Sequence, residues 1–228
     1  MNTRVSHSPF GRALDGAERN RVLRNTYALL AVSMIPTVLG AWVGVSTGIT
    51  AAMGGGLSLI LFLAAAFGFI FAIEKTKHSA AGVYVLLGFT FFMGLMMSRL
   101  IAFVLGYSNG ASLIMMAFGS TAAVFFAMAS LATVIKRDLS GLQKFLFVGV
   151  IVLLVGMVIN MFVQSSAGMI VLSLVATAIF SAFMLVDIKR VIDGGETNYI
   201  SATLAIYLDI VNVFQNLLML FGIFGGED

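Results

Sequence analysis

Four polar side chains interrupt an apolar stretch near the C-terminus of the chain. The segment IYLDIVNVFQNLLML, residues 206–220, contains Asp209, Asn212, Gln215 and Asn216. On an α-helix, at about 100° per residue, Asp209, Asn212 and Asn216 fall on one face. Such a stripe either lines a polar path or supplies amides that hydrogen-bond neighbouring helices. The aspartate is the unusual member, because an asparagine would form the same contacts without the cost of a buried charge.

A second carboxylate, Asp187, lies one predicted helix earlier. The glycine pair at 194–195 predicts that this helix ends near Asp193. Asp187 is then about 9 Å from that end, and Asp209 is about 12 to 15 Å from the start of the next helix. Two carboxyl groups at similar depth on antiparallel helices compete for one proton when they are poorly hydrated, which predicts a pH sensor. The alternative for Asp187 is a solvated position at a helix end.

Membrane-spanning helices are the elements expected to carry these residues. The 228-residue chain is 60% hydrophobic and 10% charged, whereas about one-quarter of a soluble domain is charged. Seven apolar segments are long enough to cross about 30 Å of hydrocarbon. They cover roughly residues 26–46, 54–73, 80–105, 111–134, 142–163, 169–190 and 199–223. The predicted fold is therefore all-α, a polytopic membrane protein with seven transmembrane helices.

Basic residues divide the predicted connections into two sets. Lys and Arg precede the first segment and recur in every second connection, whereas STGITAAMGGG, GYSNGA and QSSAG carry no charge. The positive-inside rule places the N-terminus in the cytoplasm and the C-terminus outside. We expect a basic cytoplasmic segment at 1–25, a transmembrane domain at 26–223 and a short acidic tail at 224–228. Asp15 and Glu18 have the spacing of a capping box for a short helix before the first span. The alternative is a disordered basic tail that only sets the orientation of the chain.

Several ionisable groups near the ends of the predicted spans have two interpretations each. Arg99 either extends to the outer headgroups or forms an ion pair along a pathway. The segment EKTKHS is most simply a loop that begins at the boundary residue Glu74. In the alternative, Lys77 or His78 reaches Asp187 as an electrostatic latch.

We predict no cofactor, no enzymatic activity and no nucleic-acid partner. The chain has no cysteine, both of its histidines lie outside the apolar segments, and its net charge of +3 comes from the connections. Intramembrane aspartyl proteases also use two aspartates, but the Tyr-Asp and Gly-x-Gly-Asp motifs are missing here. A retinal protein is excluded because the last span has no lysine for a Schiff base.

Three stretches resemble the transmembrane Bax inhibitor motif family, particularly its bacterial YccA-like members. They are AFGSTAAVFFAMASLA at 117–132, the segment 183–223 with both aspartates, and Asn160 in GMVINMF. The resemblance covers roughly residues 20 to 225 and is most specific in its C-terminal part. It implies a protein of the bacterial inner membrane with seven helices, the last at the centre of two three-helix layers.

The resemblance also implies a function. It implies a pH-sensitive calcium leak channel in which Asp187 and Asp209 share a proton when closed and separate on opening. The polar lining of the pathway would be Asn212, Asn216 and Asn160. An aspartate pair with amide oxygens is an oxygen-only site of the type that binds calcium, weakly in this case.

Two further features follow from the resemblance. In some bacterial relatives an arginine after the second span latches onto the first aspartate, a role that Lys77 or His78 would have to fill here. Relatives often have proline within the third span, where this chain has Arg99. Bacterial members are also linked to the membrane protease FtsH, so the alternative function is a non-conducting modulator of FtsH. The expected partners are membrane lipids, calcium ions and FtsH.

Overall fold

The computed structural model describes residues 16–52 and 55–226, with side chains placed for 16–50 and 60–226. The described residues form α-helices and no strand, which confirms the predicted all-α class. The helices are α1 (Gly16–Thr47), α2 (Ile49–Ala52), α3 (Gly55–Thr76), α4 (Ala80–Leu105), α5 (Gly110–Val134), α6 (Ser140–Val163), α7 (Ser166–Ile192) and α8 (Tyr199–Gly225).

Six of the described helices, α1 and α4 to α8, are long and apolar enough to cross a bilayer. Each contains one of the predicted spans. α3 has 22 residues and lies within three residues of the predicted second span at both ends, so a seventh crossing stays a prediction. The four-residue helix α2 was not expected from the sequence.

The start of α1 differs from the prediction. The helix runs without a break from Gly16 to Thr47, so residues 16–25 are its first turns and not a separate short helix. These residues contain Ala, Glu, Leu and Arg, which favour helix, and Pro36 is the first proline within the helix. Asp15, the predicted capping residue, lies outside the described residues.

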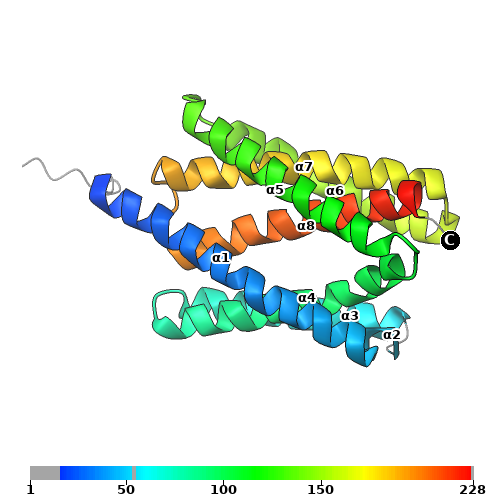
Figure 1. The fold of residues 1–228 in the computed structure, drawn as a ribbon. Coiled ribbons are helices and arrows are strands. Elements are labelled where there is room, and N and C mark those ends of the chain that lie inside the picture. Colours follow the sequence, from blue (N-terminus) through cyan, green and yellow to red (C-terminus); the bar gives the residue numbers. More distant parts are fainter. Residues whose placement is uncertain (1–15, 53–54, 227–228) are drawn as a thin grey trace, which may run out of the picture.

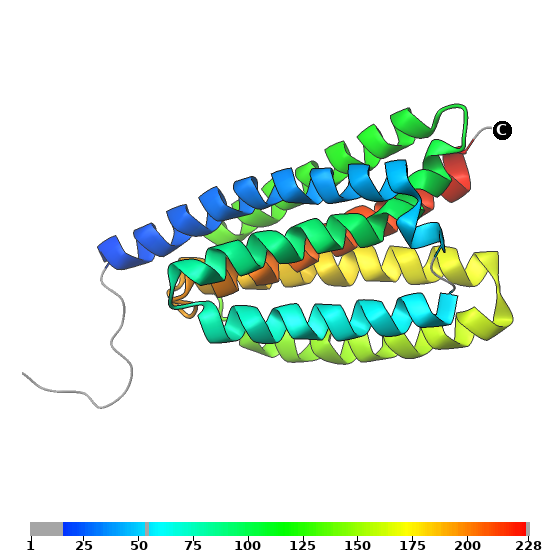
Figure 2. The same cartoon turned by 90° about the horizontal axis from the view of Figure 1, so that it is seen from below.

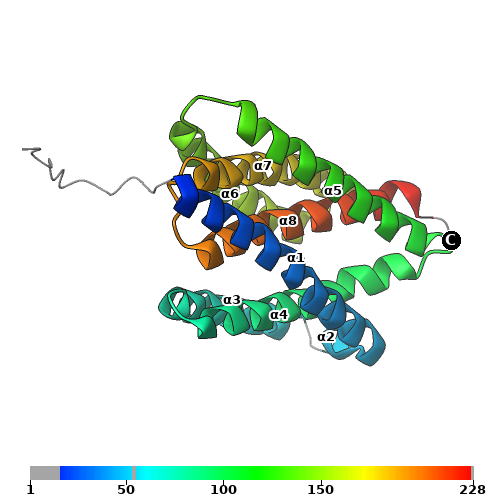
Figure 3. The same cartoon turned by 60° about the vertical axis from the view of Figure 1, so that its left-hand side comes forward.

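The last helix packs against many of the others. α8 contacts α1, α3, α4, α5 and α7, and Figures 1 and 3 show it between α7 and α4. Its side chains Ile200, Ile206, Tyr207 and Leu218 are at most 1% exposed. By contrast, α6 packs mainly against α7 and leaves most of its apolar side chains exposed, as expected for a helix that faces lipid.

The connections lie at two opposite ends of the bundle (Figures 1 and 2). The start of α1 and the α3–α4, α5–α6 and α7–α8 connections lie together at one end. We call it the basic end, because it carries Lys75, Lys77, Lys136, Arg137, Lys189 and Arg190. The α4–α5 and α6–α7 connections lie at the opposite end, which we call the neutral end.

Helices α1 and α4 approach each other closely through glycine. A Cβ atom built on Gly94 would overlap the main-chain carbonyl of Thr37, and one built on Gly40 would overlap that of Phe91. Small residues at a helix crossing allow such backbone contact in membrane proteins. Gly40 on α1 and Gly94 on α4 therefore form a tight joint between the two helices.

A buried tyrosine connects this joint to α8. The hydroxyl of Tyr207 lies 2.9 Å from Oγ1 of Thr37 and 3.3 Å from the main-chain oxygen of Thr90. Because Thr37 already donates to the carbonyl of Ser33 at 2.8 Å, the tyrosine proton is available to Thr37 Oγ1 or Thr90 O. Tyr207 thus ties α8 to both α1 and α4, two residues before Asp209.

We expect Tyr207→Phe to lower the free energy of unfolding by about 1 kcal/mol, since one buried hydrogen-bonded hydroxyl is lost with little change in shape. Equilibrium unfolding in mixed micelles measures this change. Tyr84→Phe is the matched control, because Tyr84 is 75% exposed. Equal stability of the two variants would contradict a role for the Tyr207 hydroxyl in joining the helices.

Candidate functional site

The structure brings together the two aspartates that the sequence singled out. Asp209 is 5% exposed on α8, and Asp187 is half-buried on α7. The two carboxyl groups lie within hydrogen-bonding reach of each other. No other pair of carboxylates among the described side chains makes such a contact. The site is therefore a carboxyl pair between two consecutive helices.

Helix geometry explains why these side chains meet. Asp187 is about 7 Å from the end of α7 and Asp209 is about 15 Å from the start of α8, at 1.5 Å per residue. Side chains on a helix lean toward its N-terminus. Because α7 and α8 run antiparallel, Asp187 leans toward the neutral end and Asp209 leans toward the basic end. The two side chains therefore lean toward each other, which compensates for the difference in depth between the Asp187 and Asp209 backbones.

The pair lacks one hydrogen-bond donor. Oδ2 of Asp209 is buried and has no donor among the described residues. Two ionised carboxylates offer only acceptors, so their close contact would be repulsive. A single proton on either carboxyl supplies the missing donor. The geometry therefore matches a pair that holds one proton.

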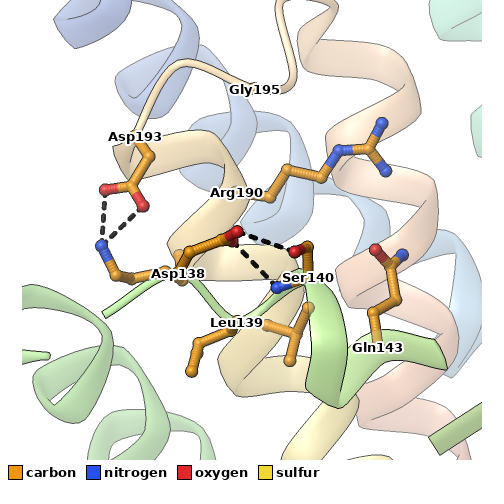
Figure 4. Close-up of a pocket in the computed structure, with 9 residues that line it drawn as sticks. Asp138, Leu139, Ser140, Gln143, Arg190, Asp193 and Gly195 are labelled. Carbon is orange, nitrogen blue, oxygen red and sulfur yellow. Dashed lines mark hydrogen bonds and ion pairs between the residues drawn. The ribbon is translucent and has the colours of Figure 1, made fainter. Parts of the chain in front are cut away.

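Few other charges act on this pair. Within the described part of the chain, Arg190 and Glu196 are the charged groups near enough to influence Asp187, besides Asp209 itself. The Arg190 side chain extends away from Asp193 (Figure 4). Lys189 is 7% exposed, and its ammonium group donates to both carboxylate oxygens of Asp193 at 2.6 Å. Lys189 is therefore neutralised by Asp193, and Arg190 is the cation that acts on Asp187.

The predicted latch is not formed in this structure. The ammonium group of Lys77 forms its ion pair with Glu74, three residues earlier on the same segment, and His78 is exposed. An ion pair between neighbours in sequence costs less conformational entropy than one between distant segments, and this favours Glu74 as the partner of Lys77. Neither Lys77 nor His78 has an ion pair with Asp187 among the described residues.

A different contact connects the α3–α4 and α7–α8 connections. The side-chain amide of Asn198 donates to the main-chain oxygen of Lys77 at 2.7 Å. Its carbonyl oxygen accepts from the amides of Ile200 and Ser201, which caps the start of α8. Asn198 was not among the predicted site residues, although an asparagine just before an apolar helix is a recognisable cap signal.

The polar stripe of α8 faces a cavity. Asn212, Gln215 and Asn216 line a cavity of about 520 Å³ that is otherwise bounded mostly by apolar side chains of α3, α4, α6, α7 and α8. Nδ2 of Asn212 donates to the main-chain oxygen of Leu208, and Nδ2 of Asn216 donates to that of Asn212, both at 2.8 Å. The structure therefore groups Asn212 and Asn216 one and two turns beyond Asp209.

Two predicted residues lie away from this group. Asn160 is 9% exposed, and its side-chain oxygen accepts from the amide of Ser165 at 3.3 Å in the α6–α7 turn. It lies beside Gly168, which is about 28 Å along α7 from Asp187. Arg99 is exposed near the end of α4 and forms no ion pair within the described part of the chain, as expected for a side chain that reaches the headgroups.

The connection between α5 and α6 contains an exposed carboxylate with a defined role. Asp138 accepts hydrogen bonds from the amide of Ser140 at 2.9 Å and from its hydroxyl at 2.7 Å (Figure 4). These two bonds, and then the charge of Lys189, hold the pKa of Asp138 below its usual range. A lowered carboxyl pKa stabilises the folded state at any pH above the pKa of an ordinary aspartate. This contribution to stability is lost as the pH falls through the pKa of Asp138 in the folded protein.

We therefore expect Asp138 to titrate below an ordinary aspartate and the start of α6 to fray in acid. Carbon-13 NMR of the Asp138 carboxyl in micelles measures the midpoint. Ser140→Ala removes the hydroxyl donor and is expected to raise this midpoint. An unchanged midpoint in Ser140→Ala would show that the hydroxyl contact does not set the pKa.

No group of three or more His, Cys, Asp or Glu side chains that could hold a metal ion occurs among the described residues. Calcium would meet two carboxyl groups at most, with amide oxygens nearby. Calcium sites that bind tightly use six to eight oxygens and more charge. The donor set therefore fits a weak and transient site.

Long apolar helices and a buried carboxyl pair define a multi-pass α-helical membrane protein. The chain belongs to the family described as "Inhibitor of apoptosis-promoting Bax1", whose sequence model matches residues 19–226. This match confirms the resemblance read from the sequence.

Several curated relatives cover nearly the whole chain. It is 35% identical over 211 residues to an uncharacterized membrane protein of Vibrio cholerae serotype O1, which covers 92% of this chain and 93% of that protein. It is also 35% identical over 203 residues to the modulator of FtsH protease YccA of Escherichia coli K12, in an alignment that covers 89% of this chain and 90% of that protein. An uncharacterized protein of Neisseria meningitidis serogroup A is 35% identical over 228 residues, in an alignment that covers 98% of this chain and 100% of that protein.

Proposed function

We propose that the protein is a pH-sensitive, calcium-permeable leak channel gated by Asp187 and Asp209. The observation that carries this proposal is the contact between the two carboxyl groups, one of which has a buried oxygen that no donor among the described residues reaches. With one proton, the pair holds α7 against α8. With none, the two charges repel each other and favour separation of the helices.

The polar stripe of α8 supports a path that continues from the gate. Asn212 and Asn216 are at the edge of the cavity, and no donor within the described part of the chain reaches their side-chain oxygens. Oxygen ligands are the type that calcium prefers. Weak ligation suits permeation, because a permeant ion must leave its site as readily as it enters.

We further propose seven spans with α8 at the centre, in the inner membrane of a bacterium. The contacts of α8 with five other helices support this arrangement. The collection of lysine and arginine at the basic end supports a cytoplasmic position for that end and for the N-terminus. The C-terminus would then lie outside.

Calcium flux in proteoliposomes tests the channel proposal. Vesicles that contain the full chain and a calcium dye are expected to fill faster than empty vesicles, and the rate is expected to rise with pH as the pair loses its proton. A rate equal to that of empty vesicles at every pH would reject the leak. A leak that does not change with pH would reject gating by the carboxyl pair.

The second candidate function is a non-conducting modulator of FtsH. A specific observation favours it, since the Escherichia coli relative is named a modulator of that protease. In this function the carboxyl pair and the amides would serve structure. Stable co-purification with FtsH and slower degradation of membrane substrates are the expected results. Deletion of residues 1–20 without effect on the protease would count against a role for the basic N-terminal segment.

A further inference from the structure

The cavity beside the polar stripe has the properties of a ligand site. Its volume is about 520 Å³, within the range of roughly 300 to 1,000 Å³ that is usual for small-molecule sites. Phe62, Phe89, Met93 and Leu172 are among its apolar walls. No charged side chain is among the described residues that line it. An apolar enclosure with a few polar groups along one edge suits an uncharged amphiphile.

The cavity reaches the lateral surface of the bundle. Ile70 on α3, Met157 on α6 and Met169 on α7 line it, and they are also 38%, 43% and 38% exposed on the outside. In a membrane-spanning bundle this lateral surface contacts acyl chains. A lipid chain can therefore enter between α3 and α6 without crossing the headgroups.

The polar edge defines which head group fits. One N–H of Asn212 and one of Asn216 are used by main-chain oxygens of α8. Their side-chain oxygens and remaining N–H groups have no partner within the described part of the chain. A hydroxyl group donates to such an oxygen and accepts from such an N–H. A phosphate would bring a charge into a cavity whose described lining has no counter-charge, which is unfavourable.

We propose that this cavity binds a neutral, hydroxyl-bearing acylglycerol, with its acyl chain along the apolar walls and its hydroxyl at Asn212 and Asn216. The proposal goes beyond the calcium leak and does not depend on it. If the channel proposal holds, the bound lipid also competes with a permeating cation for the same amide oxygens. The site is therefore a place where membrane composition acts on the polar stripe.

Photolabelling tests the site directly. The full chain, in nanodiscs of phosphatidylethanolamine and phosphatidylglycerol, is exposed to diacylglycerol with a diazirine in one acyl chain. Two matched probes carry the same chain on phosphatidylcholine or on diacylglycerol with a methylated hydroxyl. Peptide mapping is expected to find labels at Met157 and Met169, about fivefold more with the free hydroxyl than with either matched probe, as expected for one hydrogen bond. Equal labelling by all three probes would overturn the proposal, and so would stronger labelling by phosphatidylcholine.

Two substitutions on α3 separate the cavity from the general lipid surface. Ala66 lines the cavity, whereas Ala64 is exposed on the same helix and is not among the lining residues. Ala66→Phe is expected to reduce labelling at Met157 and Met169 at least fivefold, and Ala64→Phe is expected to leave it unchanged. Equal labelling of the two variants would count against an occupied cavity.

A third variant keeps the test independent of how well Ala66→Phe folds. Asn216→Leu removes one hydrogen-bonding group but leaves the apolar walls intact. It is expected to abolish the preference for the free hydroxyl over the methylated probe while labelling by the methylated probe persists. A preference retained in Asn216→Leu would show that this amide does not recognise the hydroxyl. Because labelling requires no ion flux, the result is separate from success or failure of the leak proposal.

Discussion

Proteoliposomes with Asp209→Asn are expected to leak calcium slowly at every pH, about tenfold below the wild-type rate in alkaline buffer, a gating change of about 1.4 kcal/mol. In the wild type, loss of the shared proton leaves two carboxylates in contact. At about 4 Å such a pair repels by roughly 4 kcal/mol near a protein surface, which exceeds the change required. The asparagine amide instead donates to Asp187 at any pH. The expected result is a closed and pH-insensitive protein.

The matched control is Glu74→Gln. Glu74 is an exposed carboxylate at the basic end that pairs with Lys77, and it is not among the charged groups that act on Asp187 or Asp209. This variant is expected to keep the wild-type dependence of calcium flux on pH. Identical flux curves for wild type and Asp209→Asn would remove Asp209 from the gate, whereas loss of pH dependence in both variants would point to a general charge effect at this end.

Gly94→Ala is expected to lower the free energy of unfolding by about 3 kcal/mol or more, the upper range for forcing extra volume into a packed interface. The new methyl group would overlap the carbonyl oxygen of Thr37, and a main-chain atom cannot rotate away as a side chain can. The helices α1 and α4 must separate instead. The separation also weakens the hydrogen bond between Thr37 and Tyr207, so the effect reaches α8.

Gly119→Ala and Gly68→Ala are the controls for this prediction. A Cβ atom at either position would meet nothing within 4 Å. Alanine is the better helix former by up to about 1 kcal/mol, so these variants are expected to be neutral or slightly more stable. Equilibrium unfolding in mixed micelles compares the three variants. Stability of Gly94→Ala equal to that of Gly119→Ala would mean that the α1–α4 joint tolerates a methyl group.

Much of this fold follows from the sequence by simple rules. Apart from the start of α1, the helix boundaries lie within a few residues of the predicted apolar segments, because about twenty apolar residues in a row leave few alternatives in a bilayer. Asp187 and Asp209 were also selected from sequence, since a carboxylate within an apolar span is costly and therefore rarely accidental. These predictions depend on local composition and on spacing along one helix.

The partners of individual side chains were less predictable. Lys77 was considered for Asp187 but pairs with Glu74, and Asn160 supports a turn instead of joining Asn212 and Asn216. Nothing in the sequence around Tyr207 predicts that its hydroxyl contacts α1 and α4. The Tyr207 contacts depend on how distant helices cross, which no short sequence pattern encodes, whereas Lys77 and Asn160 form contacts with neighbours in sequence.

The sequence by itself determined the class of protein, the positions of its helices and the two acidic residues of the candidate gate, because hydrophobicity and the cost of buried charge act residue by residue. Only the tertiary structure decided that the two carboxyl groups touch, that the amides of α8 open onto a cavity, and that glycines bring α1 against α4. These features arise from the relative position and rotation of packed helices. They are set by side-chain volumes and hydrogen bonds between segments far apart in the chain.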